Sequence, residues 1–250
     1  MALEHQKKRS VRSRPSRLLP PIGPIHLRPA TELAERVLLP GDPHRALAVA
    51  QVLLERPLMF NHNRGLWGYT GKAPDGEPLT VQSTGMGGPS AAIVCEELVA
   101  LGARLLVRIG TCGALDDGFE LGELVAAEAV LAADGASTAL GADGLLRPDA
   151  GLTGAILQAG ARPATVVSTD LFYDARGGMT GEWVERGATV VEMEAAAVLQ
   201  VAALRGARAA CVLAISDVPG DGGSRRLDKE GLEELAPRLG EAGYAAVRKG

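Results

Sequence analysis

Short apolar runs alternate with longer amphipathic stretches along most of the chain. The runs, rich in Val, Leu, Ile and Ala, predict β-strands, and the stretches between them predict helices. The predicted strands are 36–39, 58–61, 66–70, 79–83, 105–109, 122–133, 164–168, 189–191 and 209–215. The predicted helices are 43–54, 90–101, 152–160, 179–186, a segment starting at 195, and 227–247. This alternation predicts a single three-layer α/β/α domain with a central mixed sheet.

Glycine and proline positions refine these boundaries. The run from Gly110 to Gly113 predicts a turn that closes the strand 105–109, and the Gly, Asp and Pro residues scattered through 134–149 predict a loop. Pro237 predicts a break in the helix 227–247. The segment between Asp217 and Arg226 is short and rich in glycine.

The charge distribution separates a short basic segment from the rest. Residues 1–24 carry six basic side chains against Glu4 alone, whereas the whole chain has a formal net charge of -4. We expect a disordered basic extension over 1–24 and a single domain over 25–250. An acidic body is not typical of a nucleic-acid-binding domain, and no apolar run is long enough for a membrane span.

Cysteine and histidine usage argues against a metal site. The three cysteines lie singly in apolar surroundings, as is typical of a reducing compartment such as the cytoplasm. All four histidines precede residue 63, and no metal-ligand spacing occurs. We therefore expect a cytoplasmic protein without a metal site, and we also expect no organic cofactor.

Two acidic residues stand where a predicted strand meets a helix. Glu192 and Glu194 flank Met193, so an extended backbone would place both carboxylates on one side. One of them could face a polar ligand at the carboxyl end of the sheet, where open α/β folds keep their sites. Alternatively, both acids only complement the dipole of the following helix.

Basic and polar residues at other strand ends predict an anion site. Gly41 and Arg45 follow the first strand, Arg108 interrupts an otherwise apolar strand, and Thr111 follows it. Backbone N–H groups at a helix start and guanidinium groups together suit a phosphate. The alternative for Arg108 is an internal salt bridge. The glycine-rich stretch 84–90 resembles a dinucleotide-binding loop only superficially, because Ser90 replaces its third glycine.

Seven motifs then make the chain recognisable. They occur in one order between about His26 and Asp217: LPGDPHRA (39–46), NRGLWGYTG (63–71), TGMGGPSAAI (84–93), VRIGTCGAL (107–115), STDLFYD (168–174), VEMEAA (191–196) and ISD (215–217). This series resembles the nucleoside phosphorylase family whose members are trimers or hexamers, and is most similar to its bacterial purine nucleoside phosphorylases. The resemblance implies phosphorolysis of purine nucleosides by a homo-oligomer, expected to be a hexamer built as a trimer of dimers.

The resemblance also implies site residues. Gly41, Arg45, Arg108 and Thr111 would hold inorganic phosphate, a co-substrate, with Arg64 reaching in from a neighbouring subunit. Glu194 would bind the ribose hydroxyls, Met193 would pack beneath the sugar, and His26 of the neighbour would contact the 5′ hydroxyl. Phe172 would pack on the base, and the backbone near Glu192 would line its other side. Each active site would thus be shared between two subunits.

Asp217 would be the general acid at purine N7, and Arg225 or Arg226 would support it; Arg226 is taken as the partner. The local sequence by itself predicts that Asp217 is a helix N-cap or a turn residue. A uridine phosphorylase is the second reading, although the segment after Phe172 offers Arg176 and no glutamine. A nucleosidase that uses water and an inactive ligand-binding relative are the remaining alternatives.

Overall fold

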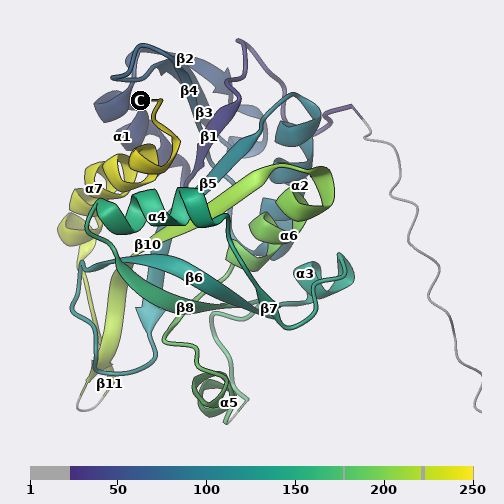
Figure 1. Ribbon diagram of the computed structural model, residues 1–250. Helices are drawn as coiled ribbons and strands as arrows, with labels where there is room; N and C mark the ends of the chain where they lie inside the picture. The colour runs from purple at the N-terminus through teal and green to yellow at the C-terminus, as the bar shows by residue number, and fades with distance from the viewer. Residues whose placement is uncertain (1–22, 177, 221–222, 250) are drawn as a thin grey trace, which may run out of the picture.

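The structure, a computed structural model, describes residues 23–176, 178–220 and 223–249. The predicted basic extension over 1–24 therefore lies almost wholly outside the described residues. Within them, eleven strands form one mixed sheet, with helices on both of its faces (Figure 1). The strands are β1 (Arg36–Leu39), β2 (Glu55–Asn61), β3 (Gly68–Lys72), β4 (Pro78–Gln82), β5 (Leu105–Ala114), β6 (Leu124–Ala133), β7 (Leu145–Leu146), β8 (Arg162–Thr169), β9 (Val190–Glu192), β10 (Arg208–Gly220) and β11 (Gly223–Arg226).

Seven α-helices and one short 3-10 helix are present in the described ranges. They are α1 (Pro43–Leu53), η1 (Asn63–Gly65), α2 (Gly88–Ala100), α3 (Gly135–Ala139), α4 (Ala150–Gln158), α5 (Met179–Glu185), α6 (Ala195–Arg205) and α7 (Lys229–Val247). None of them is long and apolar enough to cross a bilayer. The predicted α/β/α class with a mixed central sheet is confirmed.

Strand pairing follows the order β11-β10-β6-β8-β9-β5-β1-β4-β3-β2, and β7 adds to β6. Because β5 also pairs in parallel with β10, the five strands β5, β10, β6, β8 and β9 close into a ring. Strands β1, β4, β3 and β2 extend from β5 as an open sheet. β5 takes part in both regions, because β1 pairs with its first four residues, whereas β10 runs parallel to nearly its whole length. The carboxyl end of β1 thus lies beside Arg108, and the antiparallel β9 ends near Gly113.

Two hydrophobic clusters lie on opposite faces of this sheet. Alternation along β5 directs Leu106 into a cluster with residues of α2 and α6, and Val107 and Ile109 into a cluster with residues of α1, α4 and α7. Gly243 lets α7 approach β5 closely, because a Cβ there would lie 2.6 Å from Cγ2 of Ile109. The clusters fix the layers between which the strand ends meet.

Two sequence-based boundaries were wrong for tertiary reasons. β5 continues to Ala114 instead of turning at Gly110, because β9 and β10 pair with the extra residues, so Thr111 lies within a strand. Helix α7 runs through Pro237 without a break. Leu235 and Leu239, on either side of Pro237, are buried in one cluster, and this packing offsets the hydrogen bond that proline cannot donate.

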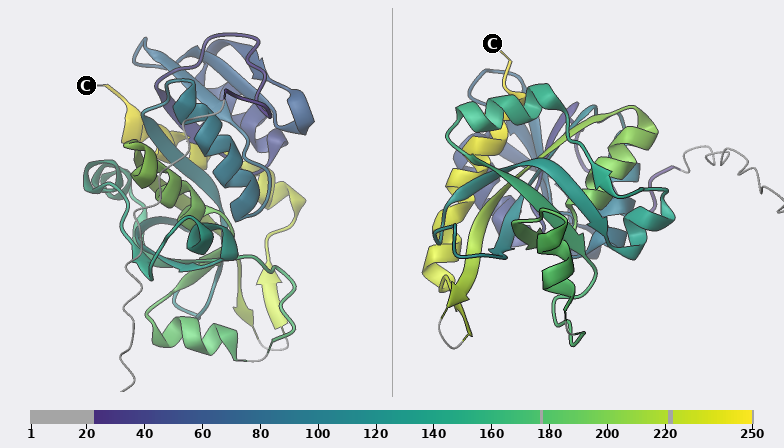
Figure 2. Two further views of the ribbon diagram at one scale, coloured as in Figure 1. Left: turned by 90° about the vertical axis from the view of Figure 1, so that its right-hand side faces the viewer. Right: turned by 60° about the horizontal axis from the view of Figure 1, so that its bottom comes forward.

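The other differences are elements that the sequence did not indicate. The predicted loop 134–149 contains α3 and β7. The glycine-rich segment after Asp217 forms the hairpin of β10 and β11. This hairpin and α5 lie at the same end of the molecule in all three views (Figures 1 and 2).

Candidate active site

A cavity of about 740 Å³ lies where the carboxyl ends of β1, β5, β9 and β10 meet. Residues of α5 and β11 close its other side. Its lining includes every predicted site residue except His26 and Arg64: Gly41, Arg45, Arg108, Thr111, Phe172, Glu192, Met193, Glu194, Asp217 and Arg226. A second cavity, of about 880 Å³ beside the C-terminal end of α7, contains none of them.

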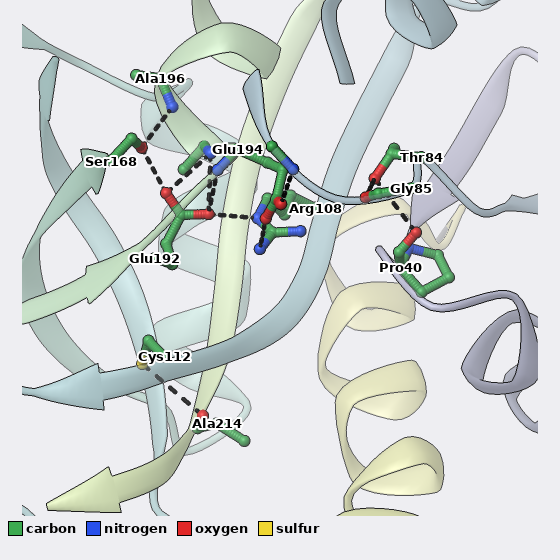
Figure 3. A network of polar contacts seen from close by, with 12 residues as sticks. Pro40, Thr84, Gly85, Arg108, Cys112, Ser168, Glu192, Glu194, Ala196 and Ala214 are labelled. Atoms are coloured by element: carbon green, nitrogen blue, oxygen red, sulfur yellow. Dashed lines mark hydrogen bonds and ion pairs between the residues drawn. The ribbon is translucent and has the colours of Figure 1, made fainter. Parts of the chain in front are cut away.

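Arg108 is the centre of the polar network in this cavity (Figure 3). Its Nε donates to Oε2 of Glu192 at 2.7 Å, and its Nη2 contacts Oε2 of Glu194. The internal salt bridge weighed from the sequence is therefore present. Burial alone would lower the pKa of Arg108, but the two carboxylates raise it, so the side chain stays charged.

One donor of this guanidinium remains available. Within the described part of the chain, Nη1 of Arg108 is buried and makes no hydrogen bond. It lies toward Gly41, where an added Cβ would be 4.0 Å from it. A buried donor without an acceptor is costly, so this position favours an anion or other acceptor beside the Gly41 loop.

Glu192 serves the framework of the site. Its carboxylate accepts hydrogen bonds from the hydroxyl of Ser168 and from the N–H groups of Glu194 and Ala195, the latter two at 2.9 Å, in addition to Arg108. It thus occupies the start of α6 and orients Arg108. The sequence left open which of the two acids could face a ligand, and four protein donors already occupy the carboxylate of Glu192. The predicted contact through its backbone stays a prediction.

Glu194 reaches Arg108 from a different direction. β9 ends at Glu192, and Glu194 has left the extended conformation, with φ -135° and ψ -24°. Its Oε1 accepts from the N–H of Gly87 at 2.5 Å. Gly87 has a φ of 84°, which glycine adopts without strain, so the glycine-rich loop presents a backbone donor to this carboxylate. Burial raises the pKa of Glu194, although Arg108 opposes the shift.

The loop after β1 adds donors and a second guanidinium. Asp42 caps α1 by accepting from the N–H of His44 at 2.7 Å, and Pro43 begins the helix. This cap places Gly41 and Arg45 at the cavity wall. Burial lowers the pKa of Arg45. The negative charge of Asp42 opposes this shift, and the positive charge of Arg108 adds to it. Two guanidinium groups at one end of the cavity make that end suited to an anion.

Asp217 lies within β10, so the N-cap alternative was wrong. In the antiparallel ladder it is the register partner of Arg226, and Oδ2 of Asp217 is 3.8 Å from Nη2 of Arg226. The hydroxyl of Ser216 lies 3.0 Å from the other carboxylate oxygen. Gly113 provides room for this side chain, because a Cβ there would be 2.6 Å from Oδ2 of Asp217.

Phe172 connects this acid to the open side of the cavity. Its ring is 56% exposed, and the guanidinium of Arg226 lies 5.2 Å from the ring centroid. Arg226 therefore contacts both the aromatic wall and Asp217. Arg176, considered from the sequence for a pyrimidine, is paired with Asp174 at 2.6 Å.

His26 and Arg64 lie together outside the cavity. The side-chain amide of Asn63 donates to the carbonyl oxygen of His26 at 2.8 Å, and Arg64 follows in η1 as an exposed residue with a φ of 59°. The ring of His26 contacts Glu97 of α2. The two residues that the resemblance assigns to a neighbouring subunit thus share one surface.

Comparison with known proteins decides the family. Residues 35–249 match the model of the phosphorylase superfamily. The chain belongs to this superfamily. It is similar to the DeoD-type purine nucleoside phosphorylase of Jannaschia sp. (strain CCS1), with 36% identity over 200 residues that cover 74% of this chain and 83% of the relative. It is 34% identical to that of Alkaliphilus metalliredigens (strain QYMF) over 228 residues, 84% of this chain and 96% of the relative.

Membership of the phosphorylase superfamily confirms the resemblance seen in the motifs. The sequence reasoning nevertheless missed three residues that shape the site: Ser168, Gly113 and Gly87. All three lie inside the quoted motifs, but their spacing carries no sign of which distant side chain each would meet. The described residues also hold no group of three His, Cys, Asp or Glu side chains that could bind a metal ion.

Proposed function

We propose that the protein catalyses the reversible phosphorolysis of purine ribonucleosides or deoxyribonucleosides to the free base and the pentose 1-phosphate. The observation that carries this proposal is the position of Arg108, which binds Glu194 through one Nη. Its other Nη makes no hydrogen bond within the described residues and lies toward Gly41. One side chain thereby joins a sugar-binding carboxylate to an anion-binding loop. The names of the relatives support the same activity. No metal or organic cofactor is required.

Phosphate is proposed to bind at the Gly41 end of the cavity. Arg45 and Arg108 supply two guanidinium groups there, and Thr111 on β5 supplies a hydroxyl. Charge-assisted hydrogen bonds to phosphate oxygens favour the dianionic or monoanionic ligand over water. Burial lowers the pKa of Arg45, and a bound anion would stabilise the charge of this buried guanidinium.

The sugar is proposed to lie between phosphate and base. Glu194 would accept hydrogen bonds from the 2′ and 3′ hydroxyls, and Met193 would pack beneath the ring. Because Gly87 and Arg108 fix both oxygens of Glu194, the carboxylate is held in place before substrate binds. This preorganisation lowers the entropic cost of orienting C1′ toward the phosphate.

The base is proposed to lie against Phe172 with N7 toward Asp217. A phosphate oxygen attacks C1′, the bond from C1′ to N9 breaks, and its electron pair passes to the purine. Asp217 donates a proton to N7 and neutralises the leaving base, and general acid catalysis of this kind contributes about two to four powers of ten. Arg226 is proposed to stabilise the Asp217 carboxylate that remains.

The complete site is proposed to need two subunits. His26 and Arg64 share one surface and lie outside the cavity of their own chain, as expected if they serve a neighbour. Arg64 would add a third guanidinium to the phosphate, and His26 would contact the 5′ hydroxyl. The assembly proposed is a hexamer built as a trimer of dimers, located in the cytoplasm, where the described free cysteines, all buried, stay reduced.

Base release tests this function directly. Adenosine, inosine, guanosine and uridine are each incubated with and without phosphate, and free base is measured. Purine release that depends on phosphate is the expected result. Dominant uridine cleavage would make the protein a uridine phosphorylase, and release without phosphate would make it a nucleosidase. Glu194→Gln and Arg108→Ala should each lose most of the activity, whereas Glu128→Gln, an exposed carboxylate on β6, should not.

A further inference from the structure

Glu97 is a buried carboxylate outside the cavity, on α2. It is 7% exposed, and its oxygens accept from three consecutive backbone N–H groups: Ile25 at 3.0 Å, His26 at 3.0 Å and Leu27 at 2.6 Å. The Nδ1 atom of His26 also lies 2.7 Å from its Oε1. One side chain of α2 thus holds a segment about seventy positions away in sequence.

The protonation of Glu97 decides the tautomer of His26. Burial alone would raise the pKa of Glu97, but the hydrogen bonds from Leu27 and His26 lower it, so the carboxylate is ionised. An ionised carboxylate only accepts hydrogen bonds, so Nδ1 of His26 must carry a proton. In the neutral imidazole, Nε2 is then an acceptor.

The position of the ring is fixed as well. The carbonyl of His26 accepts from Asn63, and the N–H of Arg28 donates to Asn61 at 2.9 Å. These contacts hold the backbone of the segment, and the contact of Nδ1 with Glu97 holds the ring on it. Its side chain remains 31% exposed on the surface that also carries Arg64.

We infer that Glu97 is a positioning residue, which holds His26 in place with Nδ1 protonated so that Nε2 accepts a hydrogen bond from the 5′ hydroxyl of the nucleoside. This inference rests on the proposed function, in which His26 serves the neighbouring active site. Glu97 itself touches no substrate. Its effect should therefore depend on whether the substrate has a 5′ hydroxyl.

The experiment compares adenosine and inosine with their 5′-deoxy analogues. The value of kcat/KM is measured for wild type, Glu97→Gln, His26→Ala and the double variant. Wild type should prefer the 5′-hydroxylated substrate by roughly tenfold, the size expected for one hydrogen bond. Glu97→Gln and His26→Ala should each remove this preference and leave the deoxy analogues within about twofold of wild type. The double variant should equal His26→Ala.

A purely structural role predicts a different pattern. If Glu97→Gln lowers kcat/KM equally for both substrate types, or lowers it further in the His26→Ala background, the assignment is wrong. The matched control is Glu96→Gln, since Glu96 is the adjacent carboxylate on α2 and pairs with Arg205 at 2.6 Å. It should keep the preference of wild type, and its loss would also refute the assignment.

A variant that leaves Glu97 intact keeps the test decisive if Glu97→Gln does not fold. His26→Asn retains an amide donor near the position of Nδ1 but places nothing at Nε2. It should lose the preference for the 5′ hydroxyl as fully as His26→Ala, and a wild-type preference would overturn the inference. Wild-type protein that releases no base from either nucleoside would instead refute the proposed function, and this inference with it.

Discussion

The two carboxylates that bind Arg108 are predicted to differ in what they contribute, and Glu192→Gln exposes the difference. Glu192 is 5% exposed and accepts from Arg108, Ser168 and the backbone of α6. Glutamine has nearly the shape of glutamate but no charge. Its amide NH₂ group takes the position of one carboxylate oxygen, where it faces a hydrogen-bond donor instead of an acceptor. Arg108 is then left with Glu194 alone.

The magnitude follows from these contacts. Breaking a buried ion pair costs about 3–5 kcal/mol, and the lower end applies because Glu194 still neutralises Arg108. For a chain of this length, each kcal/mol shifts Tm by roughly 2–4 °C, so Tm should fall by about 6–12 °C. Glu194→Gln should cost less than Glu192→Gln, because burial already disfavours the charge of Glu194 and raises its pKa, and Arg108 keeps Glu192 as its partner. Its main effect should be on activity.

Thermal unfolding measures the two variants side by side. The protomer concentration is held constant and phosphate is left out, because assembly and ligand binding both shift the apparent stability. Glu128→Gln, at an exposed residue of β6, serves as the control and should match wild type. If Glu192→Gln unfolds within about 2 °C of wild type, or if Glu194→Gln is the less stable of the two, Glu192 is not the framework of the site.

Three further predictions concern the base end of the cavity and the response to acid. Asp217→Asn should lower base release from adenosine more than from inosine, because an amide donates no full proton; an equal loss would count against Asp217 as the acid. Arg226→Met should lower kcat by about tenfold, because it removes the contact with the Asp217 carboxylate. Arg225 lies on the other face of β11, so Arg225→Met should leave kcat unchanged. Equal effects of the two variants in steady-state assays would contradict this role of Arg226. The bidentate contact with Arg36 lowers the pKa of Asp75. The ionised carboxylate should therefore stabilise the fold fully above about pH 4, and this stabilisation should be lost as the pH falls below that value. In unfolding curves measured against pH, Asp75→Asn should lose less stability on acidification than wild type, and an unchanged acid dependence would exclude Asp75 as its cause.

Local sequence determined the strands, most helices and the chemistry available at their ends. The apolar runs that became β1, β4 and β8 are strands because each buries nearly all of its side chains between two helical layers, and such burial is readable as a continuous hydrophobic pattern. Asp42 and Pro43 mark the start of α1 through interactions spanning two or three residues. The motifs likewise predicted which residues would line the cavity.

Only the tertiary structure decided the partners of those residues. Arg108 meets Glu192 across 84 positions, Gly87 meets Glu194 across 107, and Glu97 meets His26 across 71. Asp217 meets Arg226 because an unexpected hairpin sets their register. Side-chain pairing over such distances depends on the order and register of strands, which the packing of the two core clusters fixes, so no local pattern could predict it.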